Sequence, residues 1–246
     1  MAMLEEMEQT GNRLFRWRSF LPLILVGIFL LALQQYRYPD NSRLLDEYWE
    51  IICLGISFFG LGIRALTIGF TPERTSGRNT REQIADTLNT SGVYSLVRHP
   101  LYLGNFFMGL GIALFIHTWW MTLIYILLFW VYYERIMIAE EGFLRKKFGS
   151  VYLDWAAVTP AFVPRFGAYR KAELPFSFRN VLRREYNGFF AIVVTLFMLE
   201  TVGDFVTEGT FSPDTWWLVL LTISFVIWLV LRTLKKYTRL LAVEGR

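Results

Sequence analysis

The sequence is poor in the residues that build disulfides and metal clusters. Cys53 is its single cysteine, and it has two histidines. One cysteine excludes an intrachain disulfide, a cysteine zinc cluster and a cysteine redox pair. There is also no Gly-x-Gly-x-x-Gly stretch to favour a Rossmann site, and no low-complexity linker long enough to separate soluble domains. We therefore expect one domain that uses no metal.

Apolar residues, in contrast, are abundant and clustered. Of the residues, 54% are hydrophobic and 17% aromatic, and the mean hydropathy is +0.36. A spanning helix needs about 20 mostly apolar residues. Six stretches qualify: 20–36, 49–70, 101–116, 118–138, 186–206 and 215–234. The sequence predicts an all-α, polytopic integral membrane protein with about six transmembrane helices, of which the third is short.

Basic residues are distributed unequally between the connecting segments. With six spans, the N-terminal segment and the segments 71–100, 139–185 and 235–246 lie on one side of the membrane and carry most of the Lys and Arg residues. The other side has only Arg37 and Arg43. Because Lys and Arg concentrate on the cytoplasmic side, we expect both termini to be cytoplasmic. The net charge of +4 then reflects topology and contact with an anionic bilayer surface, and no nucleic-acid partner is expected.

The run 91–104, SGVYSLVRHPLYLG, places polar chemistry at a membrane boundary. Arg98 and His99 stand directly before Pro100, and no residue from Pro100 to Ile116 is charged. Proline is favoured at the first position of a helix. The free N–H groups of that first turn, together with Arg98 and His99, could hold an anion. Taken alone, Arg98 is more typical of an arginine that anchors a lipid headgroup, but His99 and the flanking pattern favour the anion site.

A second polar run continues the fourth apolar stretch. The segment 134–148 reads as the same helix leaving the membrane with a pair of acids, Glu140 and Glu141, and Gly149 offers a stop signal. The segment 150–164, rich in aromatic residues and proline, is expected at the membrane interface. A short helix over 81–88 with Thr80 as its cap is also predicted.

These two runs, in this order and spacing, resemble the isoprenylcysteine carboxyl methyltransferase family and the related membrane phospholipid methyltransferases. The resemblance covers about residues 80–166. It implies a membrane enzyme with a cytosol-facing pocket that takes S-adenosylmethionine as methyl donor and methylates a membrane lipid or a lipidated molecule. We divide the chain accordingly into two N-terminal spans (1–70), a methyltransferase core (71–166) and an extension with two further spans (167–246).

The resemblance also implies site residues. Those expected to touch the donor are Asp86, Leu88, Asn89, Tyr94, His99, Pro100, Leu101, Tyr102 and Glu140. Those expected to serve catalysis, two of them by gripping an acceptor anion, are Arg98, Arg135 and Glu141. Which acid of the Glu pair faces the donor is left open. The sequence departs from the family pattern at Ile136, where an arginine is expected, and Arg135 stands one place earlier.

Several alternatives remain open at this point. The acceptor could be a carboxylate, a phosphate or, as the nearest variant, a phospholipid amine, which would need a Glu or Tyr base. Further hypotheses are a sterol-type reductase that binds NADPH near Arg74 and Arg78, and a scaffold or transporter.

The segment 165–246 is interpreted as a packing or assembly module. Arg64 is explained equally by snorkelling and by substrate binding, and His117, Glu200 and Asp204 are expected at the membrane interface.

Overall fold

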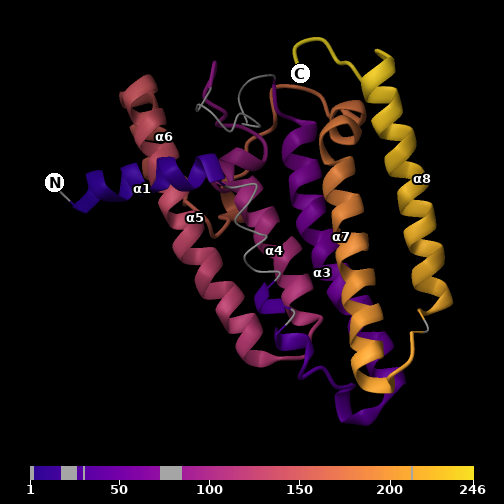
Figure 1. The fold of residues 1–246 in the computed structure, drawn as a ribbon. Helices are drawn as coiled ribbons and strands as arrows, with labels where there is room; N and C mark the ends of the chain where they lie inside the picture. The colour runs from indigo at the N-terminus through magenta and orange to yellow at the C-terminus, as the bar shows by residue number, and fades with distance from the viewer. Residues whose placement is uncertain (1–2, 18–26, 30, 73–84, 212) are drawn as a thin grey trace.

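The computed structural model describes residues 3–17, 27–29, 31–72, 85–211 and 213–246, and in these ranges every regular element is a helix (Figure 1). This confirms the all-α prediction. The α-helices are α1 (Met3–Trp17), α3 (Arg43–Gly69), α4 (Pro100–Leu114), α5 (Trp119–Phe148), α6 (Ser150–Val158), α7 (Phe178–Glu208) and α8 (Thr215–Tyr237). The short 3-10 turns are η1 (Pro39–Asn41), η2 (Val93–Ser95) and η3 (Phe166–Ala168).

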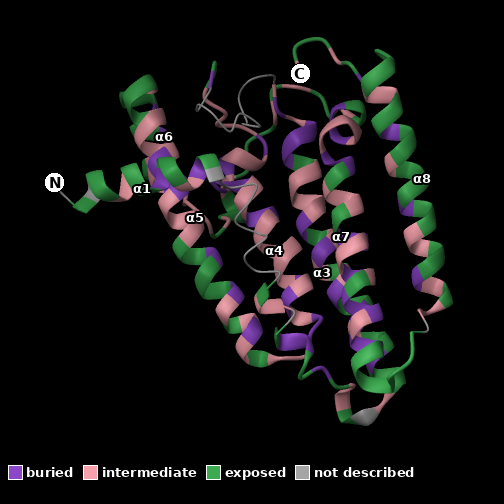
Figure 2. Cartoon of the chain, in the orientation of Figure 1, coloured by how far each residue is buried: buried purple, intermediate pink, exposed green. Residues whose placement is uncertain are grey.

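Five of the six predicted spans appear as apolar helices. In the described part, α3, α5, α7 and α8 are long and apolar enough to cross a membrane, and α4 is a shorter apolar helix, as predicted for the third span. Residues 20–26 and 30 of the predicted first span, 20–36, lie outside the described residues. Apolar side chains on the outer face of α8, such as Val219, Val226 and Val230, are exposed, as expected for a lipid-facing surface (Figure 2).

Helices α3, α4 and α7 form the centre of the bundle, with α5 on one side and α8 on the other (Figure 1). Glycines bring α3 and α4 together. A Cβ atom added to Gly104 would collide with Gly60 and Arg64, and one added to Gly111 would collide with Cys53 and Ser57. These two glycines lie seven residues apart on one face of α4, a spacing that predicts close helix packing, and the structure confirms this prediction.

The helix ends follow the sequence signals. Pro100 occupies the first turn of α4. Helix α5 runs unbroken through the membrane boundary to Phe148 and ends at Gly149, whose φ of 55° suits glycine. The predicted stop is thus confirmed. The helix predicted over 81–88 is wrong for its described part, because residues 85–88 form no helix. Helix α1, which crosses α5, and helix α6 were not predicted.

The segment after residue 166 packs tightly on the first half of the chain. Arg64 of α3 donates from Nε and Nη2 to Glu185 of α7, with both distances 2.8 Å, and from Nη1 to Asn105 of α4 at 2.7 Å. Asn180 of α7 donates to the carbonyl of Ile68 at 2.9 Å. Arg64 therefore joins three helices across the bundle, a role that the sequence did not suggest, while snorkelling and substrate binding stay predictions.

The two ends of the bundle differ in chemistry. The start of α4, the end of α5 and the chain's C-terminus lie at one end, with most of the described basic residues (Figure 1). Glu200 and Asp204 lie at the opposite end and are each only 3% exposed. Both side chains are buried between helices, and their position at the membrane interface stays a prediction. At the same end, Nε2 of His117 lies within hydrogen-bond distance of Oδ1 of Asp46, at 2.7 Å.

Candidate active site

His99 lies at the centre of a polar cluster where α4 begins. It is the residue before Pro100, it has a non-helical backbone, and it is 6% exposed. Its Nε2 atom lies 2.9 Å from Oε1 of Glu141, and its Nδ1 atom lies 3.7 Å from Oε2 of Glu140. Both acids come from the cytosolic extension predicted for α5. The structure therefore brings the two sequence runs together at this histidine.

Tyr102 extends the cluster along the first turn of α4. Its hydroxyl donates to Oε1 of Glu140 over 2.5 Å. Its ring stacks on the His99 ring, with centroids 5.7 Å apart, and lies 4.8 Å from the ring of Tyr133. Tyr133 precedes Glu140 by seven residues and hence shares its face of α5. The tyrosines fix both His99 and Glu140 in place.

Arg98 ties the cluster to the segment that follows α5. Its Nε atom lies 3.0 Å from Oε1 of Glu141, and its Nη1 atom donates to the carbonyl of Ala156 at 2.8 Å. The backbone N–H groups of Arg98 and His99 donate to the carbonyls of Pro160 and Ala161 at 2.9 and 3.2 Å. The proline-rich segment therefore closes over the loop before α4 and holds the backbone of Arg98 and His99 in place.

The carboxylates of Glu140 and Glu141 favour the protonated form of His99. Burial alone would lower the pKa of His99, but hydrogen bonds and charge from Glu140 and Glu141 outweigh burial and raise this pKa above its ordinary value. A protonated His99 and Arg98 together balance the two acids. Burial, and then the charge of Glu140, raises the pKa of the Tyr94 hydroxyl, so Tyr94 is neutral near pH 7.

A cavity of about 260 Å³ adjoins this cluster through Tyr94. Its walls come from the end of α3, from the loop before η2 and from the segment before α7. The side chains and backbone that line it belong to Thr67, Phe70, Thr71, Pro72, Thr87, Leu88, Asn89, Thr90, Ser91, Val93, Tyr94, Glu173 and Leu174. The Nδ2 atom of Asn89 is buried and has no hydrogen-bond partner within the described chain. Such an atom calls for an acceptor from a ligand.

Most of the predicted site residues lie either in the His99 cluster or in the wall of the cavity. His99, Tyr102, Glu140, Glu141 and Arg98 form one cluster; Leu88, Asn89 and Tyr94 line the cavity. Pro100 is buried at the start of α4, where it shapes the loop, and Leu101 beside it is half-buried. Asp86 is exposed and does not line the described cavity.

Arg135 is not brought into the cluster. It forms no hydrogen bond or ion pair with any residue of the described ranges, and its backbone carbonyl packs against Gly11 of α1. Five residues along a helix correspond to a turn of about 140°, so Arg135 and Glu140 lie on different faces of α5. Its role stays a prediction.

Glu173 and Leu174 are cavity residues that the sequence did not suggest. They lie in the extension, outside the runs that carry the resemblance. A backbone bridge between Gly92 and Arg170 brings this part of the chain to the cavity, with the Gly92 N–H donating to the Arg170 carbonyl at 2.9 Å. Gly92 has a φ of 60°, a backbone conformation that favours glycine.

Comparison with known proteins places these features in context. Residues 51–151 match a family described as phospholipid methyltransferase. The cobalt-zinc-cadmium resistance protein CzcN of Cupriavidus metallidurans is 36% identical over 65% of this chain and 68% of its own length. The nickel-cobalt-cadmium resistance protein NccN of Alcaligenes xylosoxydans is 29% identical over the same shares. Protein-S-isoprenylcysteine O-methyltransferase of Rattus norvegicus is 35% identical over 64% of this chain and 51% of its own. No solved structure matches.

Proposed function

This chain is an integral membrane methyltransferase of the isoprenylcysteine carboxyl methyltransferase family, and we propose that it moves a methyl group from S-adenosylmethionine to an oxyanion on a membrane lipid or lipidated molecule. The observation that carries the proposal is the His99 cluster. It joins both motif runs beside a cavity whose wall holds an unpartnered polar atom. Family membership favours this reading over a sterol-type reductase.

The residues present fit the methyl donor. Asn89 offers its unpartnered amide N–H to the adenine or ribose, and Tyr94 offers an aromatic face. Glu140 suits the ammonium group of the donor, and protonated His99 and the start of α4 suit its carboxylate. We therefore assign Glu140, the acid that Tyr102 orients, to the donor and Glu141 to holding His99 and Arg98.

The bound donor would supply an electrophilic methyl group. The protein's own contribution is alignment and exclusion of water, because a carboxylate or phosphate is already ionised at neutral pH and needs no general base. Holding two reactants in line in a dry pocket supplies roughly 7–11 kcal/mol toward the barrier. Tyr94 and His99, both poorly exposed, provide such a setting.

The acceptor needs a cation near the reacting oxygen. Arg98 is the candidate that lies in the cluster, and its ion pair with Glu141 keeps its guanidinium in a fixed orientation. Arg135 remains a predicted second contact. Binding of an anion at Arg98 would compete with Glu141, so acceptor affinity depends on both residues.

The distribution of charge supports an orientation in the bilayer. The end of the bundle that holds the His99 cluster carries Arg145, Lys146 and Lys147 at the end of α5 and Lys235 and Lys236 at the end of α8. We propose that this end, with both termini, faces the cytosol. The cavity then opens toward the soluble methyl donor, and the acceptor arrives from the bilayer. We keep the division into 1–70, 71–166 and 167–246 as a proposal. Glu173 of the extension nevertheless lines the cavity of the core.

The test is transfer of labelled methyl from S-adenosylmethionine into a total lipid extract by the purified protein in detergent, followed by mass spectrometry of the labelled species. We expect a labelled ester of a carboxylate or phosphate that depends on His99. A base-stable label on a headgroup nitrogen would contradict the oxyanion acceptor and support the amine alternative. Absence of both donor binding and label would contradict the function altogether.

A second candidate role concerns metal tolerance. CzcN and NccN, which are similar to about two thirds of this chain, are named for resistance to cobalt, zinc, nickel and cadmium. We propose that methyl transfer by this chain also serves cells exposed to such ions. Expression in a metal-sensitive bacterial strain should raise the tolerated concentration of these ions, and His99→Ala should remove that gain. Equal protection by both forms would contradict a role for methylation.

A further inference from the structure

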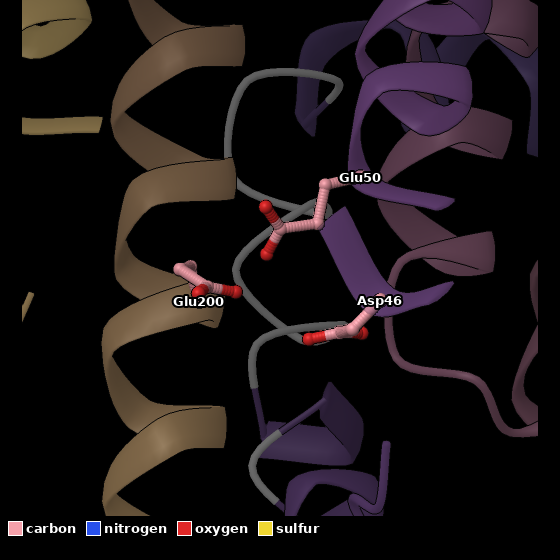
Figure 3. Close-up of side chains that lie close together, drawn as sticks. All are labelled: Asp46, Glu50 and Glu200. Carbon is pink, nitrogen blue, oxygen red and sulfur yellow. The ribbon is translucent and has the colours of Figure 1, made fainter. Parts of the chain in front are cut away.

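Three carboxylates meet at the end of the bundle opposite the His99 cluster. Asp46 and Glu50 come from the first turns of α3, and Glu200 comes from the last third of α7 (Figure 3). They are 3%, 1% and 3% exposed. One carboxylate oxygen from each lies within 4.8 Å of the others. Roughly 25 Å of α3, from Glu50 to Thr67 in the cavity wall, separates this cluster from the candidate active site.

Two oxygens of this cluster accept from no N–H or hydroxyl group. Oε1 of Glu50 and Oε2 of Glu200 are fully buried, no such donor of the described ranges reaches them, and the two carboxyl groups lie within hydrogen-bond distance of each other. Figure 3 shows the two carboxylates pointing toward each other from facing helices. Buried acceptors are almost always satisfied, and buried carboxylates are normally paired or bound to a metal. A proton shared between the two acids, or a cation between α3 and α7, would satisfy both oxygens.

Three other oxygens of the cluster accept hydrogen bonds from neutral donors. The hydroxyl of Tyr36 donates to both oxygens of Asp46 at 3.0 and 3.1 Å, and the indole N–H of Trp217 donates to Oε2 of Glu50 at 3.1 Å. Donors of this kind orient metal-binding carboxylates in proteins. They bring no positive charge, so they leave the charge of the cluster unbalanced.

The neighbouring basic residues do not balance the cluster. Arg43, at the same end of the bundle, forms ion pairs with Asp214 and Glu208 instead. Nε2 of His117 lies 2.7 Å from Oδ1 of Asp46, and even a protonated His117 compensates only one of the three carboxylates. Ionisable side chains within a membrane domain are expensive and usually functional.

We propose that Asp46, Glu50 and Glu200 bind one divalent cation, with the imidazole of His117 at the edge of the site. In a tetrahedral site with metal–oxygen distances of about 2.0–2.2 Å, neighbouring ligand atoms lie roughly 3.4 Å apart, so the carboxylate oxygens, which lie within 4.8 Å of one another, would close in slightly on a bound ion. Three buried carboxylates offer too few oxygens for Ca²⁺, which needs six to eight, and suit a small ion such as Zn²⁺ or Co²⁺. Nothing in the sequence suggested this site, because α7 meets α3 only in the folded chain.

The proposal is tested on the full-length protein in detergent after treatment with a chelator and removal of that chelator. Zn²⁺ and Co²⁺ are titrated separately while bound metal is measured by mass spectrometry and thermal unfolding is followed. We expect about one ion per chain, a visible Co²⁺ spectrum of low-coordinate type and a higher unfolding temperature with metal. Ca²⁺ serves as the control ion and should produce neither effect.

Glu50→Gln and Glu200→Gln should each weaken binding at least tenfold, whereas Glu208→Gln, an exposed acid on the same helix, should leave it unchanged. Binding of S-adenosylmethionine by the same samples reports folding and tests the methyltransferase function separately, because that site is at the other end. Wild-type protein that binds no more Zn²⁺ than Glu200→Gln, with both folded, would overturn the proposal and mean that the acids carry protons. If a variant fails to fold, absence of a saturable Co²⁺ spectrum in the wild type is the contradicting result.

Discussion

Nε2 of His99 lies 2.9 Å from Oε1 of Glu141, although 42 residues separate the two in the sequence. This contact joins the loop before α4 to the C-terminal end of α5, and Arg98 approaches the same oxygen at 3.0 Å. Glu141 therefore carries two cationic partners, which leaves Glu140 and Tyr102 to define the face that we assign to the methyl donor.

Tyr102→Phe should weaken donor binding without unfolding the protein. The substitution removes the hydroxyl that donates to Glu140 at 2.5 Å but keeps the ring that stacks on His99. A hydrogen bond to a charged group contributes about 1.5–3 kcal/mol, so donor affinity should fall roughly 10- to 100-fold. Isothermal titration with S-adenosylmethionine measures this, and an unchanged affinity would show that Glu140 does not hold the donor.

The two acids should differ when they are changed singly. Glu140→Gln should mainly reduce donor affinity, because it removes the charge assigned to the donor ammonium. Glu141→Gln should mainly lower the unfolding temperature and acceptor turnover, because it leaves Arg98 and His99 without their shared carboxylate. Donor titration and thermal unfolding of both variants check the assignment. The reverse pattern would exchange the roles of Glu140 and Glu141.

Stability should depend on pH through His99. The pKa of His99 is raised in the folded protein by Glu140 and Glu141, so its contribution is complete below the unfolded pKa of about 6.5 and is lost as pH rises through the folded pKa. The difference in unfolding temperature between wild type and His99→Gln should therefore be largest near about pH 6 and shrink toward about pH 9. A difference that grows with pH would contradict a protonated His99.

Much of the fold could be predicted because its signals are local. Pro100 marks the start of α4, Gly149 marks the end of α5, and the spacing of Gly104 and Gly111 predicts close helix packing, all of which the structure confirms. These signals depend on backbone geometry within a few residues.

What could not be predicted involves pairs that are distant in the sequence. Glu185 meets Arg64 across 121 residues, and Glu200 meets Glu50 across a longer separation. A single sequence gives the type of each residue but not its partner. It therefore left Arg64 open between snorkelling and substrate binding, and it gave no sign that Glu200 faces Glu50. Glu173 escaped notice for the same reason, since only the bridge at Gly92 brings it to the cavity.

The pair of Arg64 and Glu185 should stabilise the contact between α3 and α7. Glu185 is buried and Arg64 nearly so, and two parallel hydrogen bonds of 2.8 Å join them. Arg64→Met leaves an unpaired buried carboxylate and should destabilise the protein by about 3–5 kcal/mol. The double variant Arg64→Met, Glu185→Leu should recover part of this loss, as measured by denaturant or thermal unfolding. A double variant no more stable than Arg64→Met would contradict the pairing.

Gly111→Ala should weaken the packing of α4 on α3. The added methyl group meets the Cys53 carbonyl and the Ser57 side chain, and such overpacking costs about 1–3 kcal/mol. Gly55→Ala on α3 is the matched control, because its methyl group meets nothing within 4 Å. A loss of thermal stability confined to Gly111→Ala is the expected result, and equal effects would argue against close packing at Gly111.

The most direct test of the account is methyl transfer from labelled S-adenosylmethionine into extracted lipid by the purified wild-type protein and by His99→Ala. We expect a labelled methyl ester with the wild type and little or none with His99→Ala. Glu208→Gln, a change at an exposed residue at the other end of the bundle, should leave labelling complete. Labelling by His99→Ala at the wild-type rate would contradict the central claim that the His99 cluster forms the active site.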